Sequence, residues 1–376
     1  MSKLMMTPGP TTLKENVRSA MAREITNPDL DLDFYEFYKG ICEKLKLLLK
    51  TKNRTLVLDG EGILGLEAAC ASLIEPSDKV LCIENGIFGE GFGDFAKLYG
   101  GEVTYLHLDR RAGIDFKEVE KFLKDNHDFK VATLVHCETP SGITNDIKNV
   151  CKLLNEYNIL TVVDTVASTF GEELYVDDYK IDIALGGSQK CLSAPPGLTF
   201  LSISERAFEV MNNRKEPIRS FYANLTIWNN WYENKWFPYT QPISALNAFD
   251  EALNNVIEDK EIIDRHKRNA EAVRKAVNAA GLELLSRDCH SNTVTTILVP
   301  DSISFSDIFN KMRNEHNILI AGGFDFLKDK IIRIGHMGEN SDEEKLYKTL
   351  EALDVVFKEL GVKLKADLHK VFRNKN

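Results

Sequence analysis

Seven short β-rich runs alternate with helical patterns between residues 55 and 203, and this alternation constrains the fold more than any other feature. The runs are Thr55–Leu58, Lys79–Ile83, Val103–Leu106, Lys130–His136, Ile159–Asp164, Ile181–Leu185 and Leu198–Ile203. Several are continuously apolar, which is typical of strands that helices cover on both faces. The pattern predicts an α/β fold with a mostly parallel, seven-stranded sheet. Ligands of such sheets bind at the carboxyl ends of the strands.

The pattern changes after Ile203 and predicts a second, smaller α/β domain. A long helix over 242–280, broken near 258–261, leads into strands at 293–299 and 331–334. We expect three parts along the chain: an N-terminal segment (1–15), a large domain (16–255) and a small C-terminal domain (256–376).

The last helix of the small domain carries its own start and stop signals. Ser341 and Glu344 form a capping box at its start, and Gly361 marks its end. Four apolar residues between them fall on one stripe, which we expect to face the core. They are Leu346, Leu350, Leu353 and Phe357.

Charge and cysteine usage limit the partners and the location. The 376 residues include 47 basic and 57 acidic side chains, a net charge of −10 without a basic stripe, which argues against nucleic-acid binding. Seven cysteines without a C-x-x-C pair are typical of a reducing compartment. No apolar run reaches membrane-spanning length, and no His pairs with Cys or Asp at metal-ligand spacing. We expect a cytoplasmic protein with no metal and no membrane partner.

A G-x-G-x-x-G motif at Gly60, Gly62 and Gly65 follows the first strand and opens a helix. The next strand ends at Glu84, so strand, glycines and acid together match the dinucleotide fingerprint. An NAD-dependent oxidoreductase is therefore one hypothesis.

A second candidate site joins two strand ends. One apolar run delivers Asp164, and a buried carboxylate requires a partner. Another delivers Lys190, which stands between an apolar strand and a stiff Pro195-Pro196 turn. Desolvation there lowers the pKa of a lysine and makes it a nucleophile able to form a Schiff base. Pyridoxal phosphate requires this pair: the lysine binds its aldehyde carbon, and the carboxylate keeps its pyridine nitrogen protonated.

The segment 187–197, Gly-Ser-Gln-Lys-Cys-Leu-Ser-Ala-Pro-Pro-Gly, resembles the lysine loop of class V aminotransferases, which are pyridoxal-phosphate enzymes of fold type I. Within that class it resembles the alanine–glyoxylate, serine–pyruvate and 2-aminoethylphosphonate–pyruvate aminotransferases. The likeness spans nearly the whole chain, through further motifs at 7–11, 136–142, 163–168 and 333–335.

The resemblance implies roles for residues around the cofactor ring. Lys190 forms the Schiff base and moves a proton between the substrate and the cofactor, and Asp164 pairs with the pyridine nitrogen; these two are the catalytic residues. Val166 packs on one face of the ring and Phe88 on the other. Thr139 hydrogen-bonds near the phenolic oxygen of the ring.

The resemblance also implies how the phosphate and the substrate are held. The amides of Gly62 and Ile63, at a helix N-terminus, and the side chain of Gln189 contact the phosphate. Glu61 departs from the usual Ser or Thr. A carboxylate beside a phosphate dianion is unfavourable unless it points away or finds a cation, so we expect the two amides, rather than this side chain, to hold the phosphate.

Two further residues complete the implied site. Thr240 reaches the phosphate from the neighbouring subunit, which implies a homodimer with a shared active site. Arg333 binds the substrate carboxylate through two parallel hydrogen bonds.

The function that follows is transfer of an amino group from alanine, serine or 2-aminoethylphosphonate to pyruvate or glyoxylate, by a ping-pong Schiff-base mechanism. The oxidoreductase hypothesis explains neither Lys190 nor Asp164. A class V pyridoxal-phosphate lyase such as a cysteine desulfurase is the other alternative. It would place a His immediately before the lysine, where this chain has Gln189. The aminotransferase is therefore the preferred interpretation.

Overall fold

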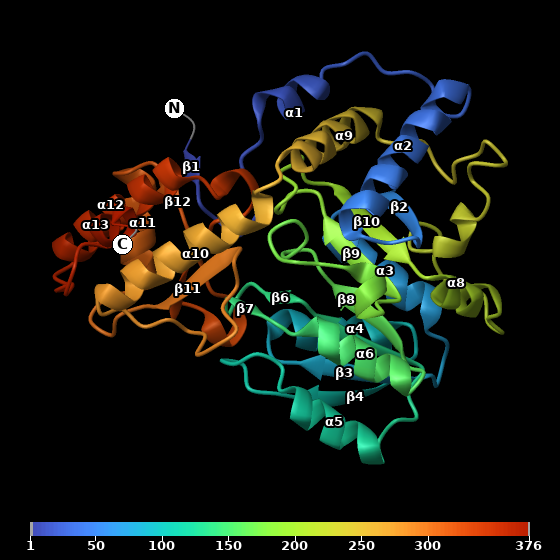
Figure 1. Ribbon diagram of the computed structural model, residues 1–376, viewed down its shortest axis with the longest axis horizontal. Coiled ribbons are helices and arrows are strands. Elements are labelled where there is room, and N and C mark those ends of the chain that lie inside the picture. Colours follow the sequence, from blue (N-terminus) through green and yellow to red (C-terminus); the bar gives the residue numbers. More distant parts are fainter. Residues whose placement is uncertain (1–2, 375–376) are drawn as a thin grey trace.

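The computed structural model describes residues 3–374 and has two lobes of unequal size. Figure 1 shows the larger lobe in blue to yellow, around a central sheet, and the smaller one in orange and red. The N-terminal strand, β1 (Leu4–Met5), pairs in parallel with β12 (Ile318–Leu319). The chain therefore begins against the small lobe and then enters the large one through α1 (Glu15–Ala20).

The large lobe is built on a seven-stranded sheet, and each of the seven predicted strands is confirmed. Its strands are β2 (Arg54–Asp59), β3 (Lys79–Glu84), β4 (Glu102–His107), β5 (Val131–Val135), β8 (Leu160–Asp164), β9 (Ile183–Gly187) and β10 (Leu198–Ile203). Their order is β2-β10-β9-β8-β5-β3-β4. Only β10 runs antiparallel to its neighbours, so the sheet is mostly parallel, as predicted.

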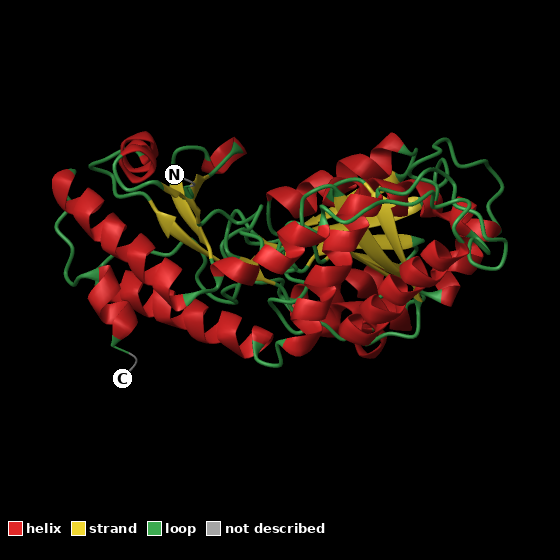
Figure 2. Cartoon of the chain, turned by 90° about the horizontal axis from the view of Figure 1, so that it is seen from above, coloured by secondary structure: helices red, strands yellow, loops and turns green. Residues whose placement is uncertain are grey.

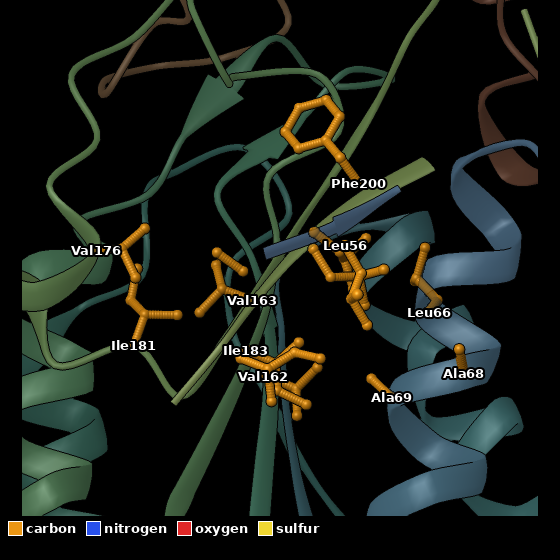
Figure 3. Packing of buried hydrophobic residues seen from close by; sticks show 14 of the residues in the cluster. Leu56, Leu66, Ala68, Ala69, Val162, Val163, Val176, Ile181, Ile183 and Phe200 are labelled. Carbon is orange, nitrogen blue, oxygen red and sulfur yellow. The ribbon is translucent and has the colours of Figure 1, made fainter. Parts of the chain in front are cut away.

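Helices cover both faces of this sheet, which is why its strands are so uniformly apolar (Figure 2). They are α2 (Leu32–Leu49), α3 (Gly62–Leu73), α4 (Ile87–Leu98), α5 (Phe116–Asp125), α6 (Ile147–Glu156), α7 (Val176–Tyr179), α8 (Glu205–Asn212) and α9 (Ile243–Glu258). Figure 3 shows Ala69 of α3 on the side of the helix toward the strand side chains, next to Ala68 in the chain. Both alanines are fully buried, and their small size lets α3 approach the sheet closely.

The small lobe packs its helices on a three-stranded sheet, ordered β11-β14-β13. Its strands are β11 (Val294–Leu298), β13 (Ala321–Gly322) and β14 (Ile331–Gly335), and its helices are α10 (Ile262–Ala279), α11 (Phe305–Asn314), α12 (Glu343–Glu359) and α13 (Leu368–Arg373). A short hairpin of β6 (Cys137–Glu138) and β7 (Ile143–Thr144) completes the strands. The predicted break in the long helix is confirmed, because α9 and α10 are separate. The predicted domain limits themselves stay a prediction.

The predicted capping box is wrong by one residue, and its helix, α12, is not the last one, because α13 follows it. Asp342, not Ser341, caps α12 by accepting a hydrogen bond from the Lys345 N–H at 2.9 Å. A carboxylate is as good a cap as a hydroxyl and also interacts favourably with the positive end of the helix dipole. Ser341 instead accepts a hydrogen bond from Asn269. The apolar stripe is buried as predicted, and Gly361 ends the helix with a φ of +81°.

The burial of His266 makes the stability of the fold depend on pH. Its Nε2 accepts a hydrogen bond from the Gly338 N–H at 2.8 Å, and its Nδ1 lies 2.6 Å from the Ile262 carbonyl. Burial lowers its pKa from 6.5 to about 4. Below pH 6.5 the unfolded chain therefore binds a proton that the folded chain does not, and stability falls as the pH falls toward 4. We expect this residue to lower the free energy of unfolding by about 2 kcal/mol between pH 7 and pH 5.

Urea unfolding of the wild type and of His266→Gln at both pH values measures this contribution. The glutamine side chain does not titrate, so its variant should lose about 2 kcal/mol less between the two pH values. Equal losses in both proteins would contradict the prediction.

Candidate active site

Lys190 lies in the turn after β9, at the carboxyl edge of the large sheet. Its Nζ donates a hydrogen bond to the Pro8 carbonyl at 2.7 Å, so the N-terminal loop fixes the position of the amine. Gly9, at a φ of +87°, allows this contact, because a Cβ there would lie 2.5 Å from Lys190 Cδ. Desolvation lowers the pKa of Lys190 and the charge of Arg333 lowers it further, against the raising effects of the Glu61 and Asp164 carboxylates.

Asp164 ends β8 at the same edge of the sheet. β8 and β9 are parallel neighbours with Asp164 beside Leu185, so the aspartate and the turn after β9 meet. The carboxylate is buried, and its Oδ1 accepts a hydrogen bond from the Val166 N–H at 2.8 Å. Burial raises the pKa of Asp164 to about 6, against the lowering effects of this hydrogen bond and of Lys190.

One cavity brings most of the sequence-predicted residues together at this edge. Its lining includes seven of them: Gly62, Ile63, Phe88, Thr139, Asp164, Val166 and Lys190. Apolar side chains from α3 and α4 form much of the remaining wall, among them Leu66, Phe92 and Phe95. Gln189, Thr240 and Arg333 were also predicted, but they lie outside this lining.

Glu138 is a residue that sequence reasoning did not assign to the site. It is fully buried beneath Phe88 and accepts hydrogen bonds from the N–H groups of Phe88, at 3.3 Å, and Gly89, at 2.5 Å. Burial raises the pKa of Glu138 to about 8, although these two hydrogen bonds lower it. The sequence signal that could have pointed to Glu138 is an acidic residue just after the apolar run 131–135. Glu138 therefore fixes the first turn of α4 and with it the backbone of Phe88.

Arg333 lies in the middle of β14 and is 9% exposed. Its Nε donates a hydrogen bond to the Gly322 carbonyl at 2.7 Å, and its guanidinium carbon lies 5.4 Å from the centre of the Phe324 ring. Within residues 3–374 its two terminal nitrogens have no hydrogen-bond partner and no carboxylate. Burial lowers the pKa of Arg333 to about 10. A buried guanidinium with a free fork of donors is suited to a carboxylate.

Glu61 lies at the N-terminus of α3 and caps it. Its carboxylate accepts a hydrogen bond from the Ile63 N–H at 3.0 Å and another from Nε2 of Gln189. The carbonyl oxygen of the same Gln189 amide is buried and has no partner within the described chain. The side chain of Glu61 therefore points into the helix end rather than away from it.

Comparison with known proteins decides the family. A family model described as aminotransferase class V matches residues 12–338. The chain is a class V aminotransferase. An uncharacterized aminotransferase of Methanocaldococcus jannaschii is 37% identical over 96% of this chain and 94% of its own length. The pyridoxamine–pyruvate transaminase of Mesorhizobium japonicum is 32% identical over 96% of this chain and 93% of its own.

The solved structures agree. The ureidoglycine–glyoxylate aminotransferase of Bacillus subtilis superposes with a TM-score of 0.96 at 30% identity, covering 100% of this chain and 98% of its own. Fold type I is therefore confirmed, as is the relation to alanine–glyoxylate aminotransferases. The oxidoreductase hypothesis is wrong for this class V aminotransferase. Glu84, its supposed ribose ligand, is buried, accepts a hydrogen bond from the Gly86 N–H and lies 3.2 Å from Arg110.

Class V aminotransferases use pyridoxal 5′-phosphate, and the two ends of the cavity differ in how well they fit it. The ring end fits, because an amine, a buried carboxylate and apolar walls meet there. The phosphate end does not fit a dianion. Both the Ile63 N–H and the Gln189 amide, which were expected to hold the phosphate, donate to the Glu61 carboxylate instead.

The remaining expectations concern partners, membranes and metals. Thr240 is exposed, just before α9, and its role toward a partner subunit stays a prediction. Within residues 3–374 no helix is long and apolar enough to cross a membrane. The same residues contain no group of His, Cys, Asp and Glu side chains arranged to hold a metal ion.

Proposed function

We propose that this class V aminotransferase moves an amino group from a small donor, alanine, serine or 2-aminoethylphosphonate, to pyruvate or glyoxylate. The observation that carries the proposal is the buried guanidinium of Arg333, whose two terminal nitrogens have no partner within residues 3–374. Its positive charge is near enough to Lys190 to lower the pKa of the lysine. A carboxylate is the anion that such a fork binds best. The names of two relatives, a pyridoxamine–pyruvate and a ureidoglycine–glyoxylate enzyme, support a small 2-oxo acid as the acceptor.

The residues of the cavity divide the work of the reaction. A bound pyridoxal ring supplies an electron sink for the substrate carbon next to the nitrogen. Lys190 Nζ, whose pKa is lowered by desolvation, would bind the aldehyde carbon of the ring compound and carry a proton between the substrate and that compound. Asp164 would hold the proton on the ring nitrogen. Val166, Phe88 and Thr139 line the same cavity and would hold the ring, the first two by packing and Thr139 by a hydrogen bond.

The same geometry supports a small substrate. The rings of Phe88 and Phe324 are in edge-to-face contact, with centres 5.8 Å apart. Phe324 also lies against Arg333, so the guanidinium is linked to Phe88 of the cavity lining through one aromatic ring. A substrate held at Arg333 and reacting beside Lys190 has little room for a large side chain.

We infer that the active unit is a homodimer in which Thr240 of each subunit completes the site of the other. The segment that contains Thr240 buries Trp228 and Phe237 against α2 but leaves other rings in solvent. Phe221 is 56% exposed, and Tyr222 and Trp236 are each 50% exposed. Exposed aromatic rings of this kind favour a subunit interface.

A screen of amino donors with pyruvate and glyoxylate tests the proposed function, with either pyridoxal or pyridoxal 5′-phosphate supplied. We expect turnover with at least one of the three small donors. Arg333→Gln should raise the KM for the oxo acid on the order of 100-fold, with a smaller change in kcat, because it removes a charge-assisted bidentate contact.

Arg287→Gln is the matched control, because Arg287 is exposed and pairs with Asp109 away from the cavity. It should leave both constants unchanged. Activity confined to large aromatic or dicarboxylic donors would overturn the small-substrate proposal.

A further inference from the structure

The carboxylate of Glu61 occupies the place in this site where a phosphate would bind. It accepts the N–H of Ile63 in the first turn of α3 and the Nε2 of Gln189 on the neighbouring turn. These are two of the three donors that the family resemblance gives to the phosphate, and the third is the N–H of Gly62. A carboxylate already takes up the hydrogen bonds and the favourable helix dipole of this corner.

Charge opposes a phosphate at the same corner. No Lys, Arg or His forms an ion pair with Glu61 anywhere in residues 3–374. Lys190 lies close enough for the charge of Glu61 to raise its pKa, but its Nζ donates its hydrogen bond to the Pro8 carbonyl instead. A phosphate dianion would therefore meet the Glu61 carboxylate at hydrogen-bond range, where the like charges repel and the charge of Lys190 compensates only in part.

A neutral hydroxymethyl group fits where the dianion does not. It is smaller than a phosphate and carries an O–H donor, whereas a phosphate dianion brings only acceptors. Two acceptors are present at the corner: the Glu61 carboxylate and the buried carbonyl oxygen of Gln189, which has no partner in the described chain. We propose that this site takes pyridoxal and pyridoxamine, the B6 compounds without a 5′-phosphate, and that Glu61 is the residue that selects them.

This inference rests on the proposed transaminase function. It makes the B6 compound a substrate that leaves the site rather than a permanently bound cofactor. Only the Lys190 bond and the ring contacts hold a compound without a phosphate, and an amine such as pyridoxamine has no bond to Lys190. It can therefore dissociate after each turnover and act as a substrate. In the balanced reaction, pyridoxamine and a 2-oxo acid give pyridoxal and an amino acid. The CH2–NH2 carbon of pyridoxamine is oxidised to the aldehyde, and the keto carbon of the acid is reduced and receives the nitrogen and a proton.

Equilibrium binding to the ligand-free protein tests the proposal without relying on turnover. Absorbance titration gives the dissociation constants of pyridoxal and pyridoxal 5′-phosphate, and borohydride followed by mass spectrometry shows which one is fixed to Lys190. We expect the wild type to bind pyridoxal at least ~10-fold more tightly, since removal of one such repulsion is worth at least one decade. Glu61→Ser should shift the ratio of the two constants toward the phosphate form by ~100-fold, because serine still caps α3 but carries no charge.

Two further variants separate charge from size and from general effects on α3. Glu61→Gln keeps the size and loses the charge, so its ratio should lie between those of the wild type and Glu61→Ser. Glu67→Gln makes the same change on the same helix, where Glu67 accepts a hydrogen bond from the Tyr99 hydroxyl, and should leave the ratio unchanged.

The outcomes distinguish this inference from the proposed function. If the wild type prefers pyridoxal 5′-phosphate and uses it in transamination, the proposed function stands and the inference is wrong. A ratio that does not move in Glu61→Ser also overturns it. If neither compound is fixed to Lys190 in any variant, both proposals fail.

Discussion

Replacing Lys190 by alanine lowers kcat/KM for transamination by a factor on the order of 10⁴ or more, the largest effect we expect from any single substitution. Lys190 is the only amine in the cavity lining, and its position depends on the Pro8 carbonyl and on the missing side chain of Gly9. In the proposed function it supplies both the nucleophile and the proton carrier, so we expect no neighbouring group to replace it. Single-turnover kinetics of pyridoxamine with pyruvate, followed by absorbance, measures the loss.

Two comparisons separate a lost catalytic group from a damaged fold. Lys121 is exposed on α5 and does not line the cavity, so Lys121→Ala should keep the full rate. A small external amine such as methylamine should restore part of the rate to Lys190→Ala, because it can carry the proton in place of the side chain. Near-normal turnover in Lys190→Ala without added amine would refute the mechanism.

Replacing Asp164 by asparagine lowers kcat on the order of 10³-fold while making the ligand-free protein more stable. The activity falls because a neutral amide cannot keep the ring nitrogen protonated, so the electron sink is lost. The stability rises because burial raises the pKa of Asp164 from 3.8 to about 6, which means that the charged carboxylate opposes folding at neutral pH. The free energy of unfolding should rise by about 3 kcal/mol at pH 7. This gain disappears below pH 4, where the carboxyl group is protonated in both the folded and the unfolded protein.

Urea unfolding at pH 7 and pH 4, alongside steady-state kinetics, checks both effects. Asparagine can still accept the Val166 N–H, so the local backbone should be preserved. Unchanged kcat would show that the carboxylate does not act on the ring. A loss of stability at pH 7 would show that the aspartate has a stabilising partner that offsets its burial.

Most of the large lobe could be predicted from the sequence, because the signals that form it are local. Continuous apolar runs such as 159–164 predict buried strands, and parallel strands bring their carboxyl ends to one edge. For this reason Asp164 and Lys190, 26 positions apart in the chain, could be placed together before any coordinates. The separation of α9 from α10 was similarly visible in the loss of apolar spacing near 258–261.

The contacts that select among ligands could not be predicted, because they join distant parts of the chain. Glu61 and Gln189 are 128 residues apart in the chain, and only the tertiary structure brings the Gln189 amide to the Glu61 carboxylate that caps α3. Glu138 likewise reaches Phe88 across 50 residues.

The sequence by itself determined the sheet, the family and the lysine–aspartate pair, since each rests on periodicity or on a continuous motif. Only the tertiary structure decided where the side chains of Glu61, Glu138 and Arg333 point. Their directions depend on hydrogen bonds and burial contributed by other elements, which no local pattern encodes.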